Sequence, residues 1–241
     1  MFILSIDVGI RNLSYTIIEI NNGIQELSIK DWNNLNLLED FNNLRYMNTI
    51  YTKMKLRTLQ KFTEHHKLQV TGKFRKNYIE TIESFMKIKK IRNTKYSPSL
   101  NELCTKLIES LDSITNWMYT NNINLDHIII ENQPNVNFQM RNLQIMIFTY
   151  FMMKKSSNTN IECISPSLKS KFCDNYLKND SKRDTYSDRK NTSVKLIKDL
   201  IGDDIENFQC WKGKKDDLAD VVCQALGFYY KITNYKLKIK Y

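Results

Sequence analysis

Acidic side chains occur at three places in the sequence where they end or interrupt a pattern of apolar residues. Asp7 ends an apolar run in SIDVGIRN, and Glu131 ends another in IIIENQ. Asp216, Asp217 and Asp220 open a periodic apolar segment in KKDDLAD, where Asp217 and Asp220 share one helical face. A carboxylate at the end of a strand, with a glycine two residues later, can point into a cleft that a ligand approaches closely. We therefore consider these acids as one site.

Carboxylates that converge in one site need a compensating charge, because four of them cannot all remain ionised side by side. Divalent cations supply that charge, and a ligand set made only of oxygens selects Mg²⁺ or Mn²⁺ over zinc. Two such ions about 3.5–4 Å apart can clamp the attacking and leaving oxygens of a phosphoryl displacement. Taken singly, each acid is equally well a turn residue or a residue of a helix's first turn. Together they predict metal-dependent phosphodiester hydrolysis.

Positive charge is concentrated in one segment of the chain. The net charge is +10 and the isoelectric point is near 9.2. Residues 53–95 hold thirteen Lys or Arg against three Glu, so this segment alone carries a net charge of +10. Such a concentration favours binding to a polyanion, with affinity from counterion release. A solvated basic face is the alternative interpretation.

The cysteine pattern indicates the redox compartment of the protein, and the hydropathy argues against a membrane-spanning segment. Five cysteines are scattered without a close pair or zinc spacing, which indicates reduced thiols in an intracellular, reducing compartment. No apolar run approaches the roughly 20 residues of a membrane span, so we expect no membrane partner. Residues 2–8 are typical of a first strand rather than of a signal peptide.

The elements that must position the acids follow from periodicity and capping signals. Strands are predicted at Phe2–Asp7, Leu13–Ile20 and Gln25–Trp32, with a turn at 21–23, and later at Leu125–Glu131 and Asn160–Ile164. Helices are predicted from the capping box of Ser99 and Glu102 to residue 120, over 138–154, after 165–167, over 193–201, and from Lys215 or Asp216 onward. A charged connection is expected over 178–192.

The order of these elements predicts an α/β fold. Three antiparallel strands followed by α/β crossovers form a mixed sheet. Residues 34–96 lack a clean period, and we expect a mainly helical, basic insertion there with a break near Thr71-Gly72. The whole chain, 1–241, is then a single nuclease domain with one insertion.

Four segments together resemble the RuvC-like Holliday junction resolvases, most of all those of poxviruses and other large DNA viruses. The matching segments are SIDVGIRNLSY, IIIENQP, SPSLKSKF and KKDDLADVVCQA. The resemblance implies a ribonuclease H-like fold and a homodimer, in which the helix 138–154 packs the subunits together. It also implies Mg²⁺-dependent paired, symmetrical nicking of four-way DNA junctions with two ions per site, Mn²⁺ being able to substitute. A viral relative would work in the host cytoplasm.

The same resemblance assigns roles to individual positions. It makes Asp7, Glu131, Asp217 and Asp220 both catalytic residues and metal ligands, with Asp217 preferred to Asp216 because the family's helical pair is spaced by three. Lys169 in SPSLK matches a family lysine that contacts the scissile phosphate. The long basic insertion at 34–96 departs from the family pattern and leaves the choice of substrate open.

Three other functions remain open at this point. Another nuclease of the same fold, acting on RNA–DNA hybrids or other branched DNA, would use the same acids. A nucleotide-binding protein of the actin-like ATPase fold also opens with a D-x-G turn, but it needs glycine-rich phosphate loops, and this chain has six unclustered glycines. A non-catalytic DNA-binding module fits the basic segment, although uncompensated carboxylates would repel phosphate.

Overall fold

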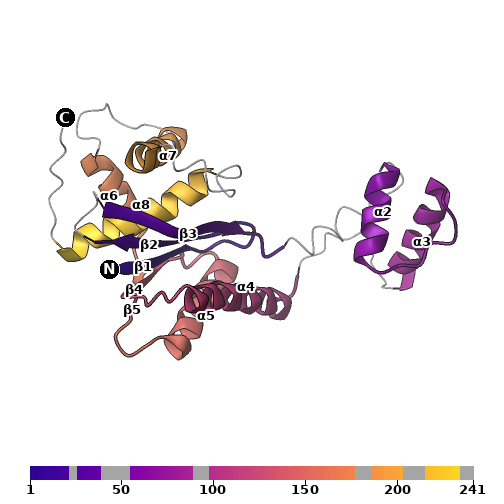
Figure 1. Ribbon diagram of the computed structural model, residues 1–241, viewed down its shortest axis with the longest axis horizontal. Coiled ribbons are helices and arrows are strands. Elements are labelled where there is room, and N and C mark those ends of the chain that lie inside the picture. Colours follow the sequence, from indigo (N-terminus) through magenta and orange to yellow (C-terminus); the bar gives the residue numbers. More distant parts are fainter. Residues whose placement is uncertain (22–25, 39–54, 89–97, 177–185, 203–214, 234–241) are drawn as a thin grey trace. The chain divides into compact units, whose positions relative to one another are not determined.

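The computed structural model shows one five-stranded mixed sheet, in the order β3-β2-β1-β4-β5, with helices on both faces (Figure 1). The described residues are 1–21, 26–38, 55–88, 98–176, 186–202 and 215–233. Strands β1, β2 and β3 are antiparallel neighbours, whereas β4 and β5 run parallel to β1. The predicted mixed sheet with three antiparallel N-terminal strands is confirmed.

The first two strands have the predicted bounds. Strands β1 (Phe2–Asp7) and β2 (Leu13–Ile20) pair in register from Phe2↔Glu19 to Asp7↔Ser14. Nearly every position in them is buried, because helices cover both faces of the sheet and leave little room for polar alternation.

The third strand differs from its prediction. Strand β3 (Leu27–Leu35) begins two residues later than the predicted Gln25–Trp32 and continues three residues further. It extends because its pairing with β2 continues to Leu13, the first residue of that antiparallel strand. A register shift between Ile17 and Ile18 accommodates one extra residue in β3. Positions 22 and 23 of the predicted turn lie outside the described residues.

Strands β4 (His127–Glu131) and β5 (Asn160–Ile164) complete the sheet. β4 starts two residues later than predicted, because Asp126 is engaged in fixing the entry to the strand. The backbone N–H of Phe2 donates to the Asp126 carboxylate at 2.7 Å, and the N–H of Asp126 donates to the Phe2 carbonyl at 3.0 Å. This pair aligns the start of β4 with the start of β1.

Helix α8 (Lys215–Thr233) crosses one face of the sheet over β1, β2 and β3. Helices α6 (Ser167–Tyr176) and α7 (Tyr186–Ile201) pack on α8, as the upper layer of Figure 1 shows. α8 is therefore enclosed on most sides, and its residues from 221 to 229 are all buried. Its predicted start is confirmed.

One helix boundary was predicted wrongly. We expected a connection over 178–192 and a helix only from 193, but α7 begins at Tyr186. The segment from 186 to 201 contains neither Pro nor Gly, and the buried Leu196 and Ile197 anchor its C-terminal half to the core. Helix propagation costs little once a packed turn exists, so the helix extends through a polar stretch that has no periodicity of its own.

Helices α4 (Leu100–Thr120) and α5 (Phe138–Lys154) form the layer on the other face of the sheet (Figure 1). Both helices have the predicted bounds. α4 buries the predicted apolar positions Leu103, Leu107, Leu111, Ile114 and Met118. α5 buries one face, through Leu143, Gln144, Ile147 and Phe151, and leaves other apolar side chains exposed.

The contacts divide the chain into two compact units, Met1–Leu37 with Leu100–Tyr241, and Leu38–Ser99. The second unit contains α2 (Leu56–His65) and α3 (Arg75–Ile88). Its two helices agree with the predicted helical character of the 34–96 segment and with the break near residue 72. That the chain forms a single nuclease domain with an insertion remains a prediction. In the described residues, no helix is both long and apolar enough to cross a membrane.

Gly227 brings α8 close to α6. A Cβ atom at this position would lie 2.8 Å from the Leu168 carbonyl oxygen, inside contact distance of backbone that cannot turn aside. Gly→Ala within a helix ordinarily stabilises by about 1 kcal/mol. We expect Gly227→Ala instead to destabilise by about 1–3 kcal/mol, because α6 must shift outward. Urea unfolding measures this change, and a stabilised variant would contradict the packing.

Candidate active site

Asp7 and Glu131 lie side by side at the carboxyl ends of two neighbouring parallel strands. The register between β1 and β4 runs to Ile6↔Ile130, and the next position on each strand is the acid. Each acid shares its face of the sheet with the residue two positions earlier, since side chains alternate along a strand. Strand geometry alone therefore places two carboxylates together beside α8.

Ser14 is the cross-strand partner of Asp7. Directly paired residues of antiparallel strands project from the same face. The Ser14 hydroxyl is buried, and no atom of the described residues forms a hydrogen bond with it. A buried hydroxyl without a hydrogen-bond partner is unfavourable, so a water or another ligand bound beside Asp7 would stabilise it.

Helix α8 brings its acids to the same end of the sheet. Asp216 and Asp217 occupy its first turn, where negative charge is favoured by the helix dipole. The Trp32 indole N–H donates to the Leu218 carbonyl at 2.9 Å in the core, which ties this turn to β3. Asp220 follows one turn later and is partly buried.

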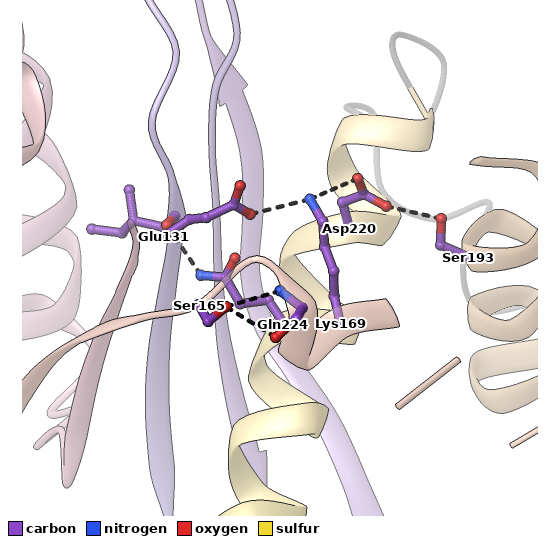
Figure 2. Close-up of polar contacts among 8 residues, drawn as sticks. Glu131, Ser165, Lys169, Ser193, Asp220 and Gln224 are labelled. Carbon is purple, nitrogen blue, oxygen red and sulfur yellow. Dashed lines mark hydrogen bonds and ion pairs between the residues drawn. The ribbon is translucent and has the colours of Figure 1, made fainter. Parts of the chain in front are cut away.

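Lys169, in the first turn of α6, joins the strand acid to the helix acid. Its Nζ lies 3.1 Å from Glu131 Oε2 and 3.1 Å from Asp220 Oδ2. Figure 2 shows the ammonium group between the two carboxylates. The two oxygens are therefore no farther apart than twice that distance, although 89 residues of sequence separate the acids. Both ion pairs are mostly shielded from solvent.

The electrostatics of Asp7 show that the acids influence one another. Burial and the negative charge of Glu131 raise the pKa of the Asp7 carboxyl from 3.8 to about 7, with smaller contributions from Asp220 and Asp217. The positive charge of Lys169 acts in the opposite direction and does not cancel them. Asp7 thus lies in a field of like charges, where a cation would be strongly stabilised.

The same carboxylates shift the pKa of Lys169. Burial by itself lowers the pKa of its ammonium group, but the negative charges of Asp220, Glu131 and Asp7 outweigh burial and raise that pKa above its usual value. Lys169 therefore remains charged at every physiological pH. It neutralises part of the acidic group within the described structure.

Sequence reasoning missed two residues beside the acids. The hydroxyl of the buried Ser193, on α7, donates to Asp220 Oδ1 at 2.9 Å (Figure 2). The Gln224 side chain, one turn after Asp220, donates to the Ile6 carbonyl at 3.2 Å and ties α8 to the strand just before Asp7. The sequence predicts Ser193 at the start of a polar helix, and nothing in its neighbouring residues indicates a role in the site. Gln224 carried one signal, as a polar residue amid an apolar helical run.

The acids fit a hard divalent cation by chemistry, although not by their arrangement as it stands. In the described part of the chain, no three His, Cys, Asp or Glu side chains form a ready metal-binding group. Lys169 accounts for this, since its ammonium group holds Glu131 and Asp220 at hydrogen-bonding distance from nitrogen rather than around a common ion. The donor set itself consists of carboxylate oxygens, which Mg²⁺ and Mn²⁺ prefer.

The structure thus brings four of the predicted site residues together: Asp7, Glu131, Lys169 and Asp220. Asp217 contributes to the field at Asp7 from the first turn of α8. Asp216 precedes it in the sequence and is partly buried. Their roles as catalytic residues and metal ligands remain predictions.

Two protein-family models match the chain, and together they cover both of its halves. The family model described as mitochondrial resolvase Ydc2 / RNA splicing MRS1 matches residues 3–135, and that described as poxvirus A22 protein matches residues 78–233. Each match spans more than half of the chain and includes Glu131. No curated protein matches the chain by sequence.

Solved structures of resolvases resemble the fold. The yeast mitochondrial Holliday junction resolvase Ydc2 has a TM-score of 0.52 at 17% identity, covering 97% of this chain and 81% of that one. The fowlpox virus resolvase has a TM-score of 0.43 both in its complex with substrate Holliday junction DNA and by itself. The identities are 17% and 15%, over 98% and 96% of this chain and 100% and 99% of those chains. The ribonuclease H-like fold class is confirmed.

Removing the charge of Asp7 should stabilise the protein when divalent cations are absent. The pKa of Asp7 is near 7 in the folded protein and ordinarily 3.8, so the folded state binds this proton more tightly than the unfolded state. Stability is therefore lost as pH rises from about 4 to about 7, with a full effect approaching about 4 kcal/mol. Asp7→Asn avoids that loss, so its advantage should grow over this range and level off above pH 7.

Thermal unfolding in a chelating buffer at several pH values measures this advantage. The exposed Asp199 on α7 provides the matched control, since Asp199→Asn makes the same chemical change away from the acids. An advantage of Asp7→Asn that does not vary with pH, or a variant less stable than the wild type at pH 8, would contradict the assigned field.

Proposed function

We propose that this chain, which belongs to the resolvase family of the mitochondrial Ydc2 / MRS1 and poxvirus A22 proteins, uses its converging carboxylates to bind divalent cations at four-way DNA junctions. Membership of the family makes the chain a nuclease, a structure-specific endonuclease that resolves such junctions. The observation that carries the proposed site is the convergence of Asp7, Glu131 and Asp220 around Lys169.

The proposed metal ligands are Asp7, Glu131, Asp217 and Asp220. Nucleases that resolve junctions depend in general on divalent metal ions. We propose Mg²⁺, replaceable by Mn²⁺, with two ions per site, because the ligands are all carboxylates and four negative charges need that much compensation. When bound, such ions supply the activation of the attacking water and the stabilisation of the leaving 3′ oxygen.

The chain's own residues orient this site. Asp7 and Glu131 project from rigid strand ends, and Ser193 holds one oxygen of Asp220 so that the other faces Glu131 and Lys169. We assign Lys169 to the scissile phosphate, because it remains protonated and already lies at the centre of the acids. An ammonium group there offsets the repulsion between the DNA backbone and the carboxylates.

The basic insertion suits the binding of junction arms. Residues 53–95 within it carry a net charge of +10, which equals that of the whole chain, so the rest of the protein is close to neutral. Contacts between cations and phosphates position a protein on DNA without reading its sequence. We therefore propose that this segment supplies much of the affinity, and the nuclease unit the chemistry.

We also propose a homodimer formed through α5. Phe138, Ile145 and Met152 are spaced by seven residues on this helix and are exposed. Apolar residues at that spacing form one stripe, which a second copy of the same helix can cover. Two copies would present two sites to the opposing strands of a junction.

The compartment is proposed as intracellular and reducing. Four cysteines of the described residues, Cys104, Cys163, Cys173 and Cys223, carry free thiols, and Cys210 lies outside those residues. The two family models name a mitochondrial and a viral protein. A poxvirus-like life cycle would place the enzyme in the host cytoplasm.

Cleavage of a synthetic four-way junction tests the proposed chemistry. The wild type should produce paired, symmetrical nicks with Mg²⁺ or Mn²⁺ and none in a chelating buffer. Asp7→Asn should lower the rate to below about a hundredth, because it removes a proposed metal ligand, while Asp199→Asn should retain full activity. Absence of nicks with either ion would refute the proposal, and faster cleavage of an RNA–DNA hybrid would assign a different substrate.

Disrupting the stripe on α5 tests the dimer. Ile145→Glu places a charge in the proposed interface and should give a monomer by multi-angle light scattering at micromolar concentration. Ile232→Glu is the matched control, because it makes the same change at an exposed position of α8, on the opposite face of the sheet. The proposal fails if the wild type is monomeric or if both variants dimerise alike.

A further inference from the structure

The turn between α2 and α3 displays an aromatic side chain to solvent. Phe74 is 80% exposed, and all six residues of TGKFRK, from Thr71 in the turn to Lys76 in the first turn of α3, are exposed. A single exposed apolar residue needs no explanation by itself. Phe74 differs from that ordinary case because its backbone is fixed and its neighbours in sequence are cations.

Asn77 fixes the backbone of Phe74 from both sides. Its side-chain oxygen accepts a hydrogen bond from the Phe74 N–H at 3.1 Å, and its own N–H donates to the Phe74 carbonyl at 2.9 Å. Gly72 permits this close approach, with a φ of +127° and with the Asn77 side chain 2.7 Å from where a Cβ would lie. The turn is thus a defined structure, and the ring projects from it.

The turn is attached to a small folded unit. Leu59, Phe62 and Ile82 form a buried cluster between α2 and α3, and other apolar residues of the unit pack around it. His66 stacks on two of the rings, at 4.2 Å from Phe62 and 5.3 Å from Phe85. This core excludes Phe74, although the ring lies only a few residues away in sequence.

Positive charge surrounds the exposed ring. Lys73 precedes Phe74, and Arg75 and Lys76 follow it, within the segment that carries a net charge of +10. An apolar protein surface would not match such charges, whereas DNA offers both phosphates for the cations and the flat face of a base for the ring. Stacking of bases on aromatic side chains beside basic residues is a general mode of binding unpaired nucleic acid.

We propose that Phe74 stacks on a base exposed at the branch point of DNA, while Lys73 and Lys76 bind the adjacent phosphates. The identity of the DNA as a branched molecule rests on the proposed function. In a continuous duplex each base is covered by its neighbours and offers no face to the ring. Phe74 therefore discriminates branched from linear DNA, which phosphate contacts alone do not do.

Binding measurements with the full chain in a chelating buffer test this inference without cleavage. Phe74→Ala should weaken binding to a four-way junction by about five- to a hundredfold, the range of a lost aromatic–base stack. Phe74→Tyr should restore binding, and the affinity for a linear duplex should not change. Lys73→Ala should weaken both DNAs alike and reduce the salt dependence of binding by about one phosphate contact.

A fluorescent base gives a direct readout of stacking. With 2-aminopurine at the branch point, the wild type should change the emission and Phe74→Ala should not. Tyr119→Ala is the matched control, because Tyr119 is an equally exposed aromatic residue outside the basic turn. Equal junction affinity of Phe74→Ala and the wild type overturns the inference, as does an equal loss for junction and duplex. Phe74-dependent binding to anionic vesicles, with DNA binding unaffected, would assign the turn to a lipid surface instead.

The inference can fail separately from the proposed function. If the wild type cuts junctions and Phe74→Ala binds and cuts them with the same affinity and rate, only the role of Phe74 fails. If Phe74 governs junction binding but no nicks appear with Mg²⁺ or Mn²⁺, the role of Phe74 stands and the nuclease chemistry fails.

Discussion

Repulsion among carboxylates that are forced together is the constraint on which the nuclease unit depends. Parallel pairing of β1 with β4 sets Asp7 beside Glu131, and α8 adds Asp220 from the far end of the chain. A group of acids in a partly buried place is unfavourable unless a cation is supplied. Lys169 supplies one within the protein itself, and the raised pKa of Asp7 shows that one ammonium group is insufficient. The remaining excess of negative charge is the physical basis of the proposed binding of hard cations at this site.

Much of the fold could be predicted because its signals are local. Apolar and β-branched runs defined β1 and β2, and a capping residue with regular apolar spacing defined α4. The errors occurred where tertiary contacts extend an element beyond its own pattern. β3 lengthens along its partner strand, and α7 begins at Tyr186 because its packed half supports a polar half. The partner strand of β3 is not visible in the sequence of β3, and the polar half of α7 has no apolar periodicity of its own that would predict a helix.

The acids of the site could be predicted for a different reason. Asp7, Glu131 and Asp220 interrupt apolar patterns, so their residue types stand out before any contact is known. Lys169 came from a family resemblance, since one lysine among many gives no pattern of its own. Ser193 could not have been found, because its importance lies only in the distance between its hydroxyl and Asp220, across two helices. The exposure of Phe74 was likewise unpredictable, because only the folded unit decides which aromatic side chains its core accepts.

Asp7 lies in the first strand and Asp220 in the last described helix. The acids can therefore meet only after the ribosome has translated that helix. When the ribosome has translated β1 through β5, the chain contains all five strands of the sheet, with Asp7 and Glu131. Helix α8, which covers one face of the sheet and carries Asp217 and Asp220, has not yet been translated. Such a nascent chain lacks two of the four carboxylates that are proposed to bind cations. Under the proposed mechanism, a product of translation that ends before α8 lacks Asp217 and Asp220 and would therefore not cut DNA.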